Sequence, residues 1–404
     1  MRSSLCQVAA SFALLSLVGA QSLPEELADA ISDYPTLSLF RSLIGAAPQG
    51  LTKTFSEKST DITVLVPTND AIEKYLKEAG VTDVTALDED DIQVFFSYHI
   101  MAASLQSSDF DDPKGKTVPT LLQSEEFNNR TAGPDLVQDF GKQATGQVVF
   151  ASKIDQSDKK EKRQQIKGDE VNLRSGLAQD VKMTAVDGKW GPKDANTFQV
   201  VNSVLLPPRP CSVTVRTVKD DRLDGLDKAL KSTGLWPALD HSKNVTCLAP
   251  TTKAFEDAGD LSKEELTGAL LAHTLDQVTY TDYLTDGMVI GTLNKTTVRV
   301  FIKGDDIYFN NAKVIKANVL TNNGLIHMLD QVIQSSGEPS SSAKGVSPSE
   351  TSSETSSETA SETGTATGTG STTSETAAQT TNAASSLSFG YAGVIALIAG
   401  LLLN

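Results

Sequence analysis

The chain has 404 residues and a formal net charge of −16, with 39% hydrophobic and 21% charged residues. This length allows two or three domains with sizeable cores. The acidic excess argues against a protein that binds nucleic acid or an anionic membrane surface.

The first 20 residues have the pattern of a secretory signal peptide. Arg2 precedes an apolar stretch from Val8 to Val18, and small residues then offer a cleavage site before Gln21. We therefore expect residues 1–20 to be removed and the remaining chain to fold in an oxidising compartment.

Helical spacing of apolar residues predicts a helix that contains residues 27–31 and a second over residues 39–44, which ends at Gly45. A third is predicted up to Gly80, and a fourth leads to Tyr98 and His99. Later in the chain, Ser262 begins a helix with a capping box. Alternating residues 298–302, a turn at 304–306 and residues 307–309 predict two paired strands.

One segment occurs twice. Residues 61–72 read D-I-T-V-L-V-P-T-N-D-A-I, and residues 244–255 read N-V-T-C-L-A-P-T-T-K-A-F. Each copy predicts a short apolar strand, a proline that ends its ladder and a threonine that caps the next helix. A repeated unit indicates two copies of one domain. The motif residues are Pro67, Thr68, Asn69 and Asp70 in the first copy, and Pro250 and Thr251 in the second.

Two further landmarks follow in the same order in both copies. The first is the pair Tyr98-His99, which is matched by alanine and His273 in the second copy. The last is N-G-L-I-H-M-L-D, which contains His327 and Asp330. Its weaker counterpart in the first copy is N-T-F-Q-V-V-N, in which glutamine and asparagine (residues 199 and 202) take the places of the histidine and the aspartate.

These three landmarks resemble the fasciclin-like domain family over residues 23–208 and 211–335. The resemblance implies two tandem α+β domains, each a β-wedge flanked by helices, at 21–208 and 209–335. The order of helices before strands also favours α+β. The first copy is longer: 100 positions (199 − 99) separate its last two landmarks, against 54 (327 − 273). We expect the extra residues in loops around 123–146 and 153–168, either as binding loops or as filler.

Secretion gives two kinds of covalent modification a chemical basis. Cys211 and Cys247 remain after signal removal, which predicts one disulfide, with two buried free thiols as the alternative. N-glycosylation sequons occur at Asn129, Asn244 and Asn294.

The C-terminal part changes composition. Residues 336–386 are rich in Ser and Thr and lack the apolar side chains needed to fold, which predicts a disordered, O-glycosylated stalk. Residues 387–404 are apolar, no Lys or Arg follows them, and small residues precede them. This pattern resembles a glycosylphosphatidylinositol (GPI) attachment signal, with Asn382 as the expected site and a retained membrane helix as the alternative. Stalk and anchor together look like those of a fungal surface protein.

The sequence contains no recognisable catalytic motif and no paired-cysteine metal motif. His273 and His327 could form a ligand or metal pair, or each could be a structural residue hydrogen-bonded inside its domain. Two histidines without a third ligand make a poor zinc site. We therefore expect no catalytic residues, no cofactor and no metal, and we interpret the motif residues as structural.

The family resemblance implies adhesion. We expect a non-enzymatic, GPI-anchored glycoprotein on the outer face of the plasma membrane or in the cell wall. Its expected partners are cell-surface, wall or matrix proteins or glycans, with the membrane reached through the lipid anchor and no nucleic acid bound. The alternatives are a ligand-binding or sensor module that uses the domain 1 insertions, a vacuolar or secretory-pathway glycoprotein, and an enzyme of unfamiliar type.

Overall fold

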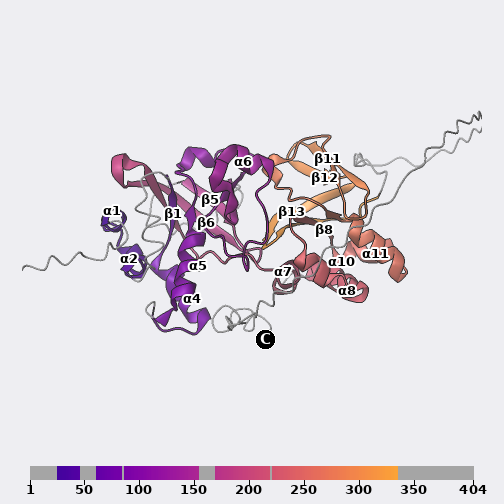
Figure 1. Ribbon diagram of the computed structural model, residues 1–404, viewed down its shortest axis with the longest axis horizontal. Helices are drawn as coiled ribbons and strands as arrows, with labels where there is room; N and C mark the ends of the chain where they lie inside the picture. Colours follow the sequence, from indigo (N-terminus) through magenta and orange to yellow (C-terminus); the bar gives the residue numbers. More distant parts are fainter. Residues whose placement is uncertain (1–24, 46–60, 84–85, 154–168, 219–220, 335–404) are drawn as a thin grey trace, which may run out of the picture. The chain divides into compact units, whose positions relative to one another are not determined.

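The computed structural model describes residues 25–45, 61–83, 86–153, 169–218 and 221–334, all of which belong to one compact unit of the chain (Figure 1). The predicted signal peptide, the stalk with Asn382, the C-terminal tail and most of the second insertion lie outside these residues. Among the described helices, none is long and apolar enough to cross a bilayer.

The first part of the chain, domain 1, is built on a seven-stranded sheet with the order β2-β1-β7-β6-β5-β4-β3. β1 and β7 run parallel, and the other neighbours are antiparallel. The strands are β1 (Thr63–Pro67), β2 (Ile100–Met101), β3 (Lys116–Pro119), β4 (Val148–Lys153), β5 (Asp169–Arg174), β6 (Asp180–Trp190) and β7 (Asn196–Val201). The helices are α1 (Glu25–Ala30), α2 (Ser38–Gly45), α4 (Asn69–Ala79), α5 (Glu89–His99) and α6 (Pro134–Phe140), with short 3-10 helices η1 (Pro35–Leu37), η3 (Ser107–Phe110), η4 (Gly141–Thr145) and η6 (Pro192–Asp194).

The second part, domain 2, has a seven-stranded sheet with the order β10-β11-β12-β13-β14-β8-β9. Here β8 and β14 are the parallel pair. The strands are β8 (Val245–Pro250), β9 (Thr274–Leu275), β10 (Val289–Gly291), β11 (Thr297–Lys303), β12 (Asp306–Phe309), β13 (Ala312–Thr321) and β14 (Gly324–Leu329). The helices are α7 (Cys211–Thr217), α8 (Asp224–Thr233), α9 (Trp236–His241), α10 (Thr252–Ala258) and α11 (Lys263–Ala272), with η7 (Asp221–Leu223) and η8 (Thr281–Tyr283).

The two sheets have the same topology, because each strand of domain 1 has a counterpart seven strands later in domain 2. Both sheets also close on themselves. A single bridge joins Met101 to Thr120 at the open edge of the first sheet, and Leu275 to Thr292 at the same edge of the second. The prediction of two tandem α+β domains, each a β-wedge flanked by helices, is therefore confirmed.

Local sequence signals explain the helices that position the motifs. Thr68 caps α4 by accepting a hydrogen bond from the amide of Ala71 at 3.3 Å, and Gly80 ends this helix with a φ of 71°. In domain 2, α11 begins at the predicted capping box of Ser262 and Glu265. These ends fix the directions in which α4, α5, α10 and α11 leave their sheets.

Each domain has two apolar clusters. One lies between the helices and the sheet and contains Phe40, Phe95 and Phe96 in domain 1. The other fills the closed sheet and includes Tyr98. Domain 2 repeats this division.

The insertion at residues 123–146 differs from the expected loop. It contains α6 and η4, which lie beside domain 2 in Figure 1. Leu136 and Ala144 of this segment share a buried cluster with Tyr280, Leu320 and Leu325 of domain 2. Burial of these apolar side chains against domain 2 stabilises the segment, so it joins the domains instead of forming an open loop.

Candidate functional site

The repeated box connects a strand to the surrounding helices. Pro67 and Pro250 end β1 and β8, and Asp70 lies in the first turn of α4. The side chain of Asn69 accepts a hydrogen bond from the amide of Leu39 at 2.9 Å and donates one to the carbonyl oxygen of Pro35 at 3.2 Å. These bonds hold α2 and η1 against α4, so this position is structural.

The second copy of the box uses its threonines in the same way. Thr251 accepts a hydrogen bond from the amide of Ala254 at 3.2 Å and so caps α10. Thr252 Oγ1, at the position of Asn69, accepts one from the amide of Gly225 at 3.0 Å. The same helix contact is therefore made with a different side chain.

His99 and His273 both join the end of a helix to the segment that follows the last strand. His99 Nδ1 lies 2.7 Å from the carbonyl oxygen of Phe95, and its Nε2 accepts from the amide of Leu205 at 3.0 Å. His273 Nδ1 lies 2.8 Å from the carbonyl oxygen of Ala269, and its Nε2 accepts from the amide of Ile333 at 2.9 Å. Since a carbonyl oxygen only accepts, both rings carry their proton on Nδ1.

Burial keeps these rings neutral. It lowers the pKa of His99 to about 4 and also lowers the pKa of His273. An imidazolium would lose the ability to accept the amide hydrogen bond at Nε2. Both ring nitrogens are occupied by main-chain groups, so neither histidine offers one to a substrate or a metal ion.

His327 binds a bulge in the neighbouring strand β13. Its Nδ1 accepts from the amide of Asn318 at 3.3 Å, and its Nε2 donates to the carbonyl oxygen of Thr279 at 2.8 Å. Asn318 has a φ of 51° and lies in the irregular part of the β13–β14 pairing. Burial lowers the pKa of His327 to about 4, so this ring is neutral with its proton on Nε2.

Gln199 makes the equivalent contacts in domain 1. Its Oε1 accepts from the amide of Asp187 at 3.0 Å, and its Nε2 donates to the carbonyl oxygen of Leu105 at 3.2 Å. Asp187 also lies in a bulge, with a φ of 50°. A glutamine thus replaces the histidine without loss of the two main-chain hydrogen bonds.

Asp330 is equally structural. Its carboxylate accepts from the amide of Lys313 at 2.8 Å, while Asn202 Oδ1 accepts from the amide of Lys182 at 2.9 Å in domain 1. The asparagine shows that the position needs an acceptor and not a charge. In the described part of the chain, no group of three or more His, Cys, Asp or Glu residues could hold a metal ion.

Tyr98 is buried in domain 1 and donates a hydrogen bond to the carbonyl oxygen of Val148 at 3.1 Å. Burial raises the pKa of this phenol well above its usual value. In domain 2 the equivalent residue is Ala272 and makes no such bond. Tyr98 therefore ties α5 to β4, close to the segment that joins the domains.

A polar contact between the domains was not predicted. The Asp282 carboxylate accepts from both the amide and the hydroxyl of Thr117, at 2.7 and 2.8 Å. Burial raises the pKa of Asp282 to about 6. The residues are far apart in sequence and match no motif, so no signal in the sequence pointed to this pair.

Two of the predicted sequons are in contact where domain 1 meets domain 2. The Asn244 side chain accepts from the amide of Thr131 at 2.8 Å and donates to its hydroxyl at 2.7 Å. Thr131 is the third residue of the Asn129 sequon. Asn294 is exposed in the turn between β10 and β11. Asn294 is therefore the most accessible of the three, and glycan occupancy stays a prediction for each.

The structure differs from the prediction at Cys211 and Cys247, which are free, buried thiols. The pKa of Cys211 is raised mainly by a hydrogen bond between the two side chains and, to a smaller extent, by burial. The two thiols are thus neighbours, with Cys211 at the start of α7 and Cys247 in β8. The bond itself stays a prediction for the oxidised protein.

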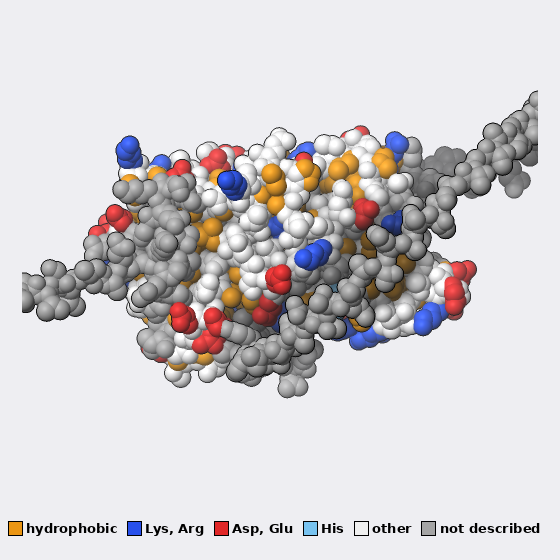
Figure 2. All heavy atoms as spheres, viewed as in Figure 1, with side chains coloured by type: hydrophobic (Ala, Val, Ile, Leu, Met, Phe, Trp, Pro, Cys, Tyr) orange, Lys and Arg blue, Asp and Glu red, His pale blue; other side chains and the backbone are white. Residues whose placement is uncertain are grey.

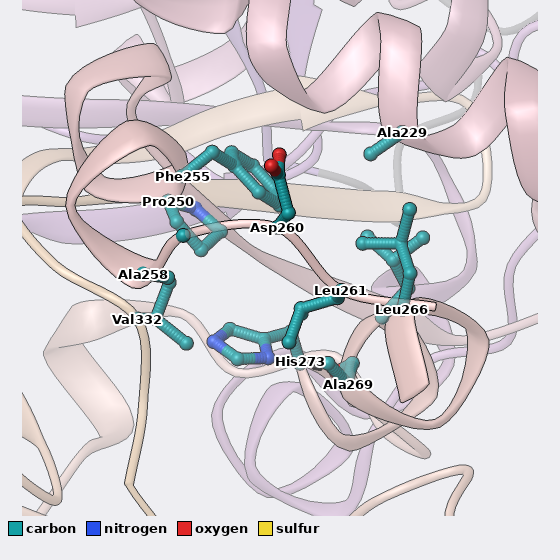
Figure 3. Close-up of a pocket in the computed structure, with 12 residues that line it drawn as sticks. Ala229, Pro250, Phe255, Ala258, Asp260, Leu261, Leu266, Ala269, His273 and Val332 are labelled. Carbon is teal, nitrogen blue, oxygen red and sulfur yellow. Dashed lines mark hydrogen bonds between the residues drawn. The ribbon is translucent and has the colours of Figure 1, made fainter. Parts of the chain in front are cut away.

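Domain 2 contains a pocket of about 220 Å³ between α8, α10 and α11. Figure 3 shows the His273 ring facing this space from below and Phe255 lying across it. The wall is mostly apolar and includes Pro250, Phe255, Leu261, Leu266 and Val332. The sequence did not predict this pocket, because its residues come from α8, the end of β8, α10, α11, the loop between these two helices and the segment after β14.

Comparison with known proteins gives consistent matches. A profile of the fasciclin domain matches residues 35–166 and 221–335. The chain is 25% identical over 332 residues to a fasciclin-like arabinogalactan protein of Phaeosphaeria nodorum, which covers 78% of this chain and 91% of that protein. It is 30% identical over 122 residues to periostin of Homo sapiens, which covers 28% of this chain and 15% of periostin. A solved FAS1 domain pair from the insect cell adhesion molecule fasciclin I covers 75% of this chain and 98% of its own, with 13% identity and a TM-score of 0.32.

Proposed function

Because the chain belongs to the fasciclin domain family, we propose that it is a non-enzymatic glycoprotein whose two fasciclin domains mediate adhesion or contact with a cell wall or matrix. The name of a similar protein supports a role at the cell surface or wall, because that protein is a fasciclin-like arabinogalactan protein. The family that matches is not a catalytic one.

The observation that carries the proposal is the use of the family histidines. Both ring nitrogens form hydrogen bonds to main-chain groups in each of the three family histidines, His99, His273 and His327. An enzyme that used these positions would need a free nitrogen of suitable pKa within reach of its substrate. The repeated motifs therefore build two rigid domains, and contact with a partner falls to their surfaces.

The surface supports a partner other than nucleic acid. On the face shown in Figure 2, acidic and basic side chains are interspersed with uncharged ones. The net charge of −16 adds a general repulsion from polyanions. Proteins or glycans of a cell surface, wall or matrix are the partners we propose.

The proposed location is the outer face of the plasma membrane or the cell wall, with a GPI anchor near Asn382 and a vacuolar location as the alternative. The support comes from the apolar C-terminal tail and the small residues before it. Release of the protein from membranes by a phospholipase that cuts inositol anchors would support the anchor. Recovery of a C-terminal peptide that reaches Asn404 from the mature protein would contradict it.

A binding experiment tests the adhesion role. The tagged, secreted chain is added to whole cells and to isolated wall and matrix fractions, with an acidic glycoprotein of similar charge as the control. We expect saturable binding that an excess of untagged protein displaces. A deglycosylated sample separates recognition by the domains from recognition by glycans. Binding no greater than that of the control protein to every fraction would contradict the proposal.

A further inference from the structure

The pocket of domain 2 lies where domain 1 has larger side chains. The equivalence follows from hydrogen bonds: the carbonyl oxygen of Phe95 meets the ring of His99, as that of Ala269 meets the ring of His273. Counting from the capping threonines Thr68 and Thr251 places Tyr75 opposite Ala258. The bonds from Leu39 to Asn69 and from Gly225 to Thr252 place Leu43 opposite Ala229.

In domain 1 these larger side chains fill the space. The rings of Phe95 and His99 are stacked, with centroids 4.3 Å apart and an angle of 24° between their planes. Tyr75 packs against Phe95 with a centroid distance of 6.5 Å, and Leu43 is buried in the same cluster. One face of the His99 ring is therefore covered by an aromatic ring from its own chain.

In domain 2 alanines occupy all three positions, and Ala229, Ala258 and Ala269 all line the pocket. The effect reaches the residue before the helix cap. Leu87 lies just before the residue that caps α5 and is 8% exposed. Leu261 lies just before the residue that caps α11 and is 42% exposed. The His273 ring has lost its aromatic neighbour, although both of its nitrogens keep their main-chain partners.

We propose that this pocket binds a small, uncharged molecule with a single aromatic ring, which stacks on His273 as Phe95 stacks on His99. The size fits, because a buried apolar cavity of about 150 Å³ is sufficient for benzene and this pocket measures about 220 Å³. Phe255, Leu261 and Leu266 provide apolar walls for the ring edge. The carboxylate of Asp260 at the same pocket disfavours an anionic ring such as benzoate.

The test is an NMR titration of the whole protein with phenol, with cyclohexanol and benzoate as comparison ligands. We expect phenol to shift the ring resonances of His273 in a saturable manner and to bind up to about tenfold more tightly than cyclohexanol, since aromatic stacking adds to simple burial. We expect benzoate to bind more weakly than phenol.

Variants locate the site. Ala269→Phe restores the side chain of domain 1 and should weaken phenol binding by about tenfold or more. Ala258→Tyr fills the same space from α10 and gives a second test should the first variant fold poorly, with thermal melts to check both. Gly268→Ala is the matched control, because a Cβ at this position has no atom within 4 Å.

Binding of phenol to wild type and to Gly268→Ala, with loss in a folded filled variant, supports the site. Three results would overturn it: no saturable shift at His273, equal affinity for phenol and cyclohexanol, or unchanged phenol binding in a folded filled variant. The proposal does not depend on the adhesion role, and the two experiments succeed or fail separately.

Discussion

In domain 1, Phe95 covers one face of His99, whereas in domain 2 Ala269 leaves the same face of His273 open to a pocket. The main-chain hydrogen bonds of the two histidines are nevertheless the same. The comparison separates two kinds of position in one fold. Apart from Tyr98, whose counterpart is an alanine, the motif side chains that hold the main chain keep their role in both copies, while side chains that only fill space are free to differ.

The second difference is the segment between β3 and β4. In domain 1 it contains α6 and η4 and packs against domain 2, whereas the matching segment between β10 and β11 is a short turn with the exposed sequon Asn294. The two domains therefore differ in two features: the helical segment that packs between the domains belongs to domain 1, and the pocket beside His273 belongs to domain 2. The alternative function, a sensor that binds its ligand through the 123–146 insertion, is less favoured, because part of this insertion is buried against domain 2.

The largest expected effect comes from emptying the filled site. Phe95→Ala should lower the free energy of unfolding by about 3–5 kcal/mol, because Phe95 is buried and its removal leaves a cavity beside His99. Denaturant unfolding of the whole chain, followed by hydrogen exchange in α5, measures the loss. A cost below about 1 kcal/mol would contradict the claim that Phe95 fills a site in domain 1 that is open in domain 2.

Acid should weaken both domains through their histidines. The pKa values of His99 and His327 are about 4, below the ordinary value of 6.5, so the folded state favours the neutral rings. Their stabilisation is present above pH 6.5 and is lost as the pH falls towards 4, by about 3 kcal/mol for each ring. Unfolding curves between pH 7 and 4 test this, and His327→Gln should remove the part of the pH dependence that His327 contributes, while His273 still titrates in domain 2.

Asp282 gives a pH dependence of opposite sign at the junction. Its pKa of about 6 lies above the ordinary value, so its contribution is present at low pH and decreases as the pH rises through 6. Asp282→Asn removes this titration and serves as the control for the histidine curves.

The cysteine pair distinguishes domain 2 from domain 1, where Val64 occupies the position of Cys247 in the parallel strand pair. We expect Cys247→Val to cost about 2–4 kcal/mol in protein prepared without reductant, because the predicted disulfide is lost. With reductant the cost should fall below about 1.5 kcal/mol, since valine fills the same place. Two reactive thiols per chain in the denatured, unreduced protein would contradict the disulfide.

The exchange of His327 for Gln199 between the domains predicts unequal variants. His327→Ala leaves the amide of Asn318 and the carbonyl oxygen of Thr279 without partners and should cost about 1–3 kcal/mol. His327→Gln should cost less, because Gln199 makes both bonds in domain 1. Thermal melts at neutral pH decide between them. Equal stability of the two variants and wild type would contradict a structural role for His327.

The smallest effect is expected at Asp330. Asp330→Asn should change the free energy of unfolding by less than about 0.5 kcal/mol, because Asn202 accepts the equivalent amide hydrogen bond. Asp330→Ala, which removes the acceptor, is the matched variant and should cost about 1 kcal/mol. A large loss for the asparagine variant would mean that the charge matters.

The sequence predicted the parts of the fold that local signals determine. The cap of α4 at Thr68, the capping box at Ser262 and the alignment of His327 with Gln199 all agree with the structure. The strands β4 to β6 were not predicted, because their register depends on pairing across the sheet. The helix α6 was expected as a loop, since its apolar face becomes meaningful only against Tyr280 and Leu325.

The pocket shows the same limit. Counting outward from the repeated landmarks puts Ala269 opposite Phe95 and Ala258 opposite Tyr75, but a linear alignment gives no reason to think that these positions meet. Only the packing of α8, α10 and α11 brings the alanines around one ring of His273. Spatial convergence of residues from separate helices is what sequence reasoning lacked.

The central claim is that the family histidines hold the main chain through both ring nitrogens, as the proposed structural role of the motif requires. A nitrogen-15 NMR measurement of histidine tautomers at neutral pH tests it most directly. The hydrogen bonds predict neutral rings with the proton on Nδ1 in His99 and His273, and on Nε2 in His327. A charged ring, the opposite tautomers or shifts typical of a metal-bound nitrogen at any of the three would contradict the account.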